Sequence, residues 1–188
     1  MRLHKLTILA FASLLTVVLL SACGGQRAQV PETSVEVDSL APLYPDYTDV
    51  TVPANIAPLN CMLEHTDATD MVMVLKGEQG DELITGGEGL KVRIDTTAWR
   101  DLLQANRGKE ITVTVYAETA KGWKRYQPHH IRVAQEEIDA FLTYRLIEPG
   151  YELYRQLGIY QRNLTNWDVE TVYENNRVFE DGDNHCIN

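Results

Sequence analysis

Cysteine is the residue type in this 188-residue chain whose positions say most about chemistry, and Cys23 is the clearest case. It ends the tetrapeptide Leu-Ser-Ala-Cys, the bacterial lipobox, and follows an apolar run from Leu6 to Leu20. A cationic start, an apolar run too short to span a bilayer and small residues before a cleavage point are typical of a secretory signal. The lipobox predicts diacylglyceryl transfer to the Cys23 thiol, cleavage before that residue and acylation of the new amine.

This N-terminus also predicts where the protein resides. Residues 1–22 are expected to be a signal peptide that is removed, which leaves the lipidated Cys23 as the first residue. Several acyl chains on one residue give a stable membrane anchor. Gly24 and Gly25 follow, with no Asp directly after the cysteine, as in lipoproteins sorted to an outer membrane. The alternative is an ordinary signal peptide with an incidental cysteine.

The charge of the chain limits its partners. The formal net charge is −10, and removal of Arg2 and Lys5 with the signal peptide would make it −12. Binding to nucleic acid or to anionic headgroups needs Lys and Arg to neutralise phosphates. We therefore expect no nucleic-acid partner, and we expect the lipid rather than electrostatics to hold the protein at a membrane.

The other two cysteines, Cys61 and Cys186, allow two interpretations. In an oxidising compartment they can form a disulfide, although spacing in sequence does not give their distance. Alternatively, Cys186-Ile187-Asn188 is the opening of C-x-x-C-H, the c-type haem attachment motif, in which two thiols bind the haem and the histidine ligates iron. Both interpretations stay open at this stage.

Between these cysteines the sequence predicts a mainly β fold, an antiparallel, immunoglobulin-like β-sandwich over residues 44–134. Short apolar or alternating runs separated by glycine-rich turns are typical of that architecture. The runs are 71–75, 83–85, 90–94, 111–116, 123–126 and 131–133. Residues 23–43 are polar and rich in Pro, Glu, Thr and Ser, which predicts a flexible tether.

Helical patterns interrupt and follow the sandwich. A short inserted helix is expected with Thr97 as its N-cap, with Trp99, Leu102 and Leu103 on its apolar face, and with Gly108 after its end. Trp99 is expected to anchor the core. Residues 135–162 are expected to be a helical segment, because Ile138, Phe141, Leu142 and Leu146 repeat at helical spacing. Residues 163–188 lack periodicity and are expected to form an extended arm.

No pattern in the chain indicates catalysis, and we expect a protein that is not an enzyme. The acidic residues have no spacing that favours a general acid–base pair. His129 and His130 are adjacent on extended chain, so they point to opposite faces and are poor joint ligands for a metal. The aromatic residues Trp123 and Tyr126 favour core packing, but with Trp99 they could instead line a face that binds carbohydrate or peptide.

Several stretches of the chain resemble one family of proteins. They are YPDY at 44–47, VPANIAPLN at 52–60, YRLIEPGYE at 144–152, GIYQRNL at 158–164 and the ending NHCIN at 184–188. These stretches resemble the N-terminal part of large bacterial lipoproteins described as TolB-like, or cytochrome c-type, β-propeller proteins. In that family a similar β-domain leads into a C-x-x-C-H segment and then a propeller.

The resemblance implies a binding or scaffolding module that precedes a propeller. It implies that six residues in the specific stretches dock that propeller: Arg145, Glu148, Tyr151, Glu152, Arg162 and Asn163. The alternative, given equal weight, is that these residues cap helices and pair with neighbours in the same segment. The motif beginning at Cys186 lacks its second cysteine and its histidine within these residues. No cofactor is therefore expected in these residues. Haem c is expected only if the chain continues past Asn188.

Overall fold

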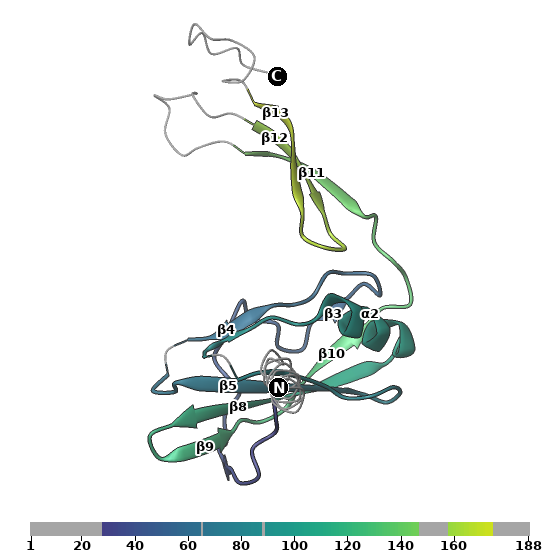
Figure 1. Ribbon diagram of the computed structural model, residues 1–188. Coiled ribbons are helices and arrows are strands. Elements are labelled where there is room, and N and C mark those ends of the chain that lie inside the picture. Colours follow the sequence, from purple (N-terminus) through teal and green to yellow (C-terminus); the bar gives the residue numbers. More distant parts are fainter. Residues whose placement is uncertain (1–27, 65, 88, 147–157, 175–188) are drawn as a thin grey trace, which may run out of the picture.

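A computed structural model describes residues 28–64, 66–87, 89–146 and 158–174 of the chain. The fold is mainly β and sandwich-like, as the sequence predicts. Figure 1 shows a layered body and, above it, a separate β ribbon that projects away. The body contains the core, and the ribbon is formed by the last three strands.

The central strand of the body is β8 (Glu110–Thr119). Its alternate residues, from Ile111 to Thr119, are buried, as expected for a strand with one face toward a core. It pairs antiparallel with β5 (Asp70–Gly77), β9 (Gly122–Arg125) and β10 (His129–Val133). The strands expected at 71–75, 111–116, 123–126 and 131–133 are therefore confirmed.

Shorter strands complete this large sheet. Strand β6 (Leu83–Gly86) pairs antiparallel with β5. Strands β1 (Val35–Glu36) and β3 (Thr51–Val52) pair parallel with β9 and β10, respectively. The sheet therefore contains parallel pairs at its margins, whereas the sequence predicts a purely antiparallel sandwich.

A small second sheet supplies the opposite layer of the core. It consists of β2 (Leu43–Tyr44), β4 (Cys61–Leu63) and β7 (Lys91–Val92), all antiparallel. Apolar side chains of both sheets meet in one buried cluster, among them Leu63 and Val92 from the small sheet and Met71, Val113 and Val133 from the large one. This two-layer core is what stabilises the sandwich.

Helix α2 (Thr96–Ala105) is the inserted helix that the sequence predicts. Its N-cap is Asp95 rather than Thr97, and the Asp95 Oδ1 atom accepts a hydrogen bond of 2.9 Å from the amide of Ala98. Aspartate is the better cap because its carboxylate reaches the free amides of the first turn. No helix of the described residues is long and apolar enough to cross a membrane.

The prediction of a flexible tether up to residue 43 is wrong for its second half. Strand β1 pairs with β9, and the Glu36 carboxylate lies 2.6 Å from the Arg125 guanidinium. Farther along, Ala41 and Leu43 are buried in the core. The segment contains few apolar residues, but two of them, Ala41 and Leu43, pack into the core. Its polar residue Glu36 forms an ion pair with the body.

The projecting ribbon is a three-stranded antiparallel sheet of β11 (Phe141–Leu146), β12 (Gly158–Asn163) and β13 (Val169–Glu174). The prediction of a helical segment over 135–162 is therefore wrong for both described ends, and the extended arm over 163–188 contains a paired strand. Residues 147–157 and 175–188 lie outside the described residues.

The physical reason for this error lies in the pairing of β11. Phe141, Thr143 and Tyr144 favour strands, and each has a cross-strand neighbour on β12. A helix with Phe141, Leu142 and Leu146 on one face would need an apolar surface to cover it. In the structure these three side chains are exposed instead, so no such surface competes with strand pairing.

Candidate functional site

The projecting sheet is attached to the body through the turn between β12 and β13. The amide of Ala57 donates to the carbonyl of Leu164 at 2.8 Å, and the indole N–H of Trp167 donates to the carbonyl of Pro58 at 2.9 Å. The two groups on the body, the amide of Ala57 and the carbonyl of Pro58, both belong to the loop that follows β3. Trp167 has a φ of 68°, a left-handed conformation that is uncommon for a bulky residue.

A second attachment lies where the chain leaves the body toward β11. The side chain of Asn55 accepts from the amide of Ile138 at 2.9 Å and donates to the carbonyl of Ile138 at 2.8 Å. Arg107, at the end of α2, forms an ion pair with Glu137. The sheet is therefore held at its base by two points, while its strands extend away from the body (Figure 1).

One face of the projecting sheet is apolar and aromatic. Cross-strand partners share a face and successive residues alternate between faces. The pairs Leu142↔Arg162, Tyr144↔Tyr160 and Arg162↔Val169 therefore belong to one face. We call this the tyrosine face and define it by Leu142, Tyr144, Leu146, Tyr160, Arg162 and Val169. The rings of Tyr144 and Tyr160 lie 5.8 Å apart, and the Tyr160 hydroxyl bonds to Glu174.

Half of the exposed large apolar side chains among the described residues belong to this sheet. Of the ten large apolar residues that are exposed in the described part of the chain, five lie in its strands β11 and β13. On the tyrosine face Leu142 and Leu146 are each 51% exposed and Val169 is 45% exposed. Such a cluster on one element indicates an interaction surface rather than scattered surface residues.

The residues that the family resemblance implies for docking are only partly brought together. Arg162 is exposed on the tyrosine face, whereas Arg145 pairs with Ile159 and lies exposed on the opposite face. Asn163 pairs locally, because its Oδ1 atom accepts from the amide and hydroxyl of Thr165, each at 2.8 Å. Glu148, Tyr151 and Glu152 lie outside the described residues.

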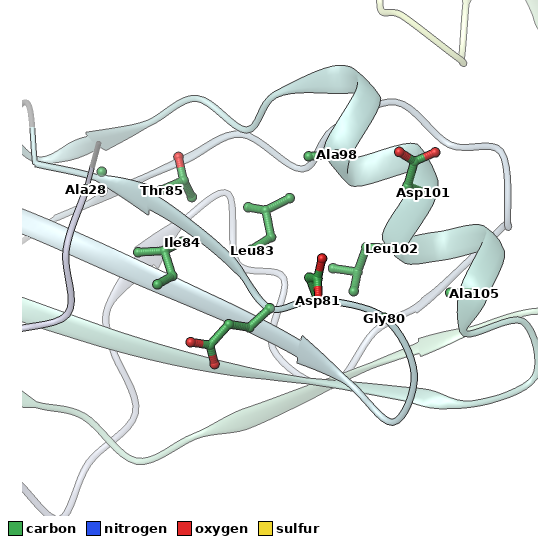
Figure 2. A pocket seen from close by; sticks show the side chains of 12 residues that line it. Ala28, Gly80, Asp81, Leu83, Ile84, Thr85, Ala98, Asp101, Leu102 and Ala105 are labelled. Carbon is green, nitrogen blue, oxygen red and sulfur yellow. The ribbon is translucent and has the colours of Figure 1, made fainter. Parts of the chain in front are cut away.

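A second candidate site is a groove of about 790 Å³ between β6 and α2, shown in Figure 2. Its apolar walls include Leu83, Ala98 and Leu102, and Asp81 and Asp101 stand at its rim. No motif in the sequence predicted this groove. The signal was present in two parts, a short strand after a glycine-rich turn and alanines on a helix, but no sequence pattern places those parts side by side.

The interior of the sandwich holds the remaining nucleophilic and titratable side chains. Cys61 is a free, buried thiol, and burial raises its pKa to about 12, so it is a poor nucleophile. Its predicted partner Cys186 lies outside the described residues, as does Cys23. The disulfide, the haem attachment and the lipidation therefore stay predictions.

Two further sequence predictions are confirmed within the body. His129 is 3% exposed and His130 is exposed, so they do point to opposite faces. Trp99 is 1% exposed in the core. Tyr126 is buried as well, as the core-packing prediction has it, and Trp123 is half-buried. Within the described ranges, no three His, Cys, Asp or Glu residues are grouped to hold a metal ion.

No protein-family model, no curated protein and no solved structure matches this chain.

Proposed function

We propose that this protein is a non-catalytic lipoprotein of the bacterial cell envelope that binds a partner through its projecting sheet. Cys23 carries the lipid anchor, and the body and sheet are presented from the outer membrane. The partner we propose is a β-propeller domain, either continuous with this chain or separate. This part of the proposal comes from the family resemblance in the sequence.

The observation that carries the proposal is the exposure of the tyrosine face. Leu142, Leu146 and Val169 expose about half of their side chains on a sheet that stands apart from the core. An isolated three-stranded sheet with uncovered apolar residues gains stability when a partner covers it. Arg162 on the same face adds a charged group that can pair with an acidic residue of the partner.

Photocrosslinking in the native envelope tests this proposal. A benzoylphenylalanine at Leu142 should form a discrete adduct with a propeller-containing protein, because that side chain is exposed on the tyrosine face. The matched control is Leu40, which is 47% exposed on the body and lies outside the projecting sheet. Adding Val169→Asp should abolish the Leu142 adduct, since a buried charge opposes docking.

Two results would contradict the proposed role of the sheet. One is an equal adduct pattern from Leu142 and Leu40, which would mean nonspecific contact with neighbours. The other is a Leu142 adduct with a protein that contains no propeller, which would overturn the proposed partner.

A further inference from the structure

Strand β6 leaves one edge open. It pairs with β5 from Val72↔Gly86 to Leu75↔Leu83, and no second strand of the described residues pairs with it. In an antiparallel pair, alternate residues turn their N–H and C=O groups toward the partner, and the other residues turn theirs away. No backbone hydrogen bond between described residues outside the β5 pairing uses Leu83 to Gly86. Such an edge is a template for an added strand.

The groove between β6 and α2 is shaped to receive such a strand. Figure 2 shows Leu83 and Thr85 on the side of β6 that faces the helix, with Ala98 and Leu102 on the helix opposite. Ala98 is exposed and has only a methyl side chain, so it leaves room beside the strand. The groove is open to solvent along its length and has a volume of about 790 Å³, which leaves room for the side chains of an added strand.

The groove along β6 has acidic side chains at one end and basic side chains at the other. Asp81, Glu82 and Asp101 line its start, and none of them is in an ion pair with another described residue. Lys91 and Arg93 line a smaller hollow of about 340 Å³ at Thr85 and Gly86, where the strand ends. The acidic and basic groups thus lie at opposite ends of one four-residue strand.

We propose that the open edge of β6 binds an extended peptide segment of another protein as an added strand. The segment carries a Lys or Arg residue at the Asp81–Asp101 end and an acidic residue at the Lys91–Arg93 end. Main-chain hydrogen bonds to β6 supply affinity, and alternate apolar side chains enter the groove beside Leu83 and Leu102. This site is separate from the tyrosine face and does not depend on the function proposed for it.

The charge pattern favours a polypeptide strand over an anionic lipid or a nucleic acid. An anionic lipid or nucleic acid would meet the three carboxylates at the Asp81–Asp101 end of the groove. An added strand from a peptide avoids this repulsion and uses the open backbone groups. A second copy of this chain, paired antiparallel through its own β6, would place acidic ends against basic ends, so it is the competing occupant that the experiment below tests.

A phage library of random heptapeptides, selected on the full chain in mild detergent, tests the proposal. We expect enrichment of alternating apolar peptides with Lys or Arg near one end and Asp or Glu near the other. The best peptide, labelled with fluorescein, should bind with a Kd that rises at least tenfold in Ala98→Trp, because the indole fills the groove. Thr97→Trp, an exposed neighbour on the same helix that does not line the groove, should leave the Kd unchanged.

A charge swap then tests the orientation of the peptide. Asp101→Lys should weaken binding at least tenfold, and a peptide with its Lys or Arg changed to Glu should recover most of that loss. Asp139→Lys, exposed elsewhere, is the control. Enriched peptides without a charge pattern, equal binding by Ala98→Trp, or no enrichment would each overturn the proposal. So would a dimer of the chain that Ala98→Trp dissociates, since a second copy would then occupy the edge.

Discussion

The indoles of Trp99 and Trp167 bind the same loop of the body from two different elements. Trp99, on α2, donates to the carbonyl of Ile56 at 3.0 Å, and Trp167, after β12, donates to the carbonyl of Pro58 at 2.9 Å. One indole is buried in the core and the other is half-buried at the base of the projecting sheet. The loop between β3 and β4 therefore connects the core to the base of the projecting sheet.

Replacing Trp167 by Phe should loosen the projecting sheet without unfolding the body. The change removes the hydrogen bond to Pro58, which contributes about 1 kcal/mol in a typical case. Hydrogen exchange of the β11–β13 amides should become faster, while exchange of the β8 amides should stay slow. Mass-spectrometric hydrogen exchange measures both regions in one experiment.

Trp99→Phe is the matched control for that experiment. It removes the same kind of hydrogen bond, but it also leaves a cavity in the core and an unsatisfied carbonyl at Ile56. The free energy of unfolding should fall by about 2–4 kcal/mol, and exchange should accelerate throughout the body. Equal exchange patterns for the two variants would contradict the separate roles assigned to the two indoles.

A buried contact between Gly77 and Asn106 should show strong coupling. Asn106 is fully buried; its side chain accepts from the amide of Gln79 at 3.0 Å and donates to the carbonyls of Gln79 and Leu102. A methyl group at Gly77 would overlap the Asn106 amide. Gly77→Ala should therefore destabilise by about 1–3 kcal/mol, as overpacking does.

A double-mutant cycle measures that coupling. Asn106→Ala removes the group that the new methyl would strike, so Gly77→Ala should cost less in that background than in the wild type. Urea unfolding of the four proteins gives the energies. Strictly additive costs would mean that the two residues do not constrain each other.

His129 should make the stability of the protein depend on pH. Burial lowers the pKa of His129, and this effect outweighs the opposing charges of Asp49 and Asp46; neighbouring His130 also lowers it. The unfolded chain then binds a proton more readily than the folded one, so stability is full above about pH 6.5 and is lost as the pH falls through that value. The carboxyl groups whose pKa is lowered, such as Asp67, act only near pH 4 and below.

Urea unfolding at pH 8 and pH 5.5 should detect this dependence. A single such group contributes at most about 1.4 kcal/mol per pH unit. The difference between the two pH values should shrink in His129→Gln and persist in His130→Gln, which replaces the exposed neighbour. The same pH dependence in both variants would show that another group is responsible.

The sandwich could be predicted from the sequence because its signals are local. The alternation from Ile111 to Tyr116 and the run from Met71 to Leu75 fit only a strand with at least one buried face, and the structure places both at the centre of the large sheet. The apolar face of Trp99, Leu102 and Leu103 likewise required a helix against the core.

The projecting sheet could not be predicted because its stability depends on pairing between distant segments. The spacing of Ile138, Phe141 and Leu142 suits a helix, and only the partner strand at 158–163 decides in favour of β11. Trp167 was not identified, because a tryptophan in an aperiodic segment gives no indication of the carbonyl it will meet. The β6 groove was missed for the same reason, since it is formed by a strand and a helix that meet only in the fold.

The role proposed for the projecting sheet requires that Cys23 anchor the protein at the envelope membrane. The most direct test is the intact mass of the protein purified from native membranes. We predict a chain that begins at Cys23 and carries a diacylglyceryl group and an N-linked acyl chain, while Cys23→Ser accumulates as an unlipidated precursor. An unmodified Cys23 thiol, or a Cys23→Ser protein that is processed normally and stays membrane-bound after a high-salt wash, would contradict the account.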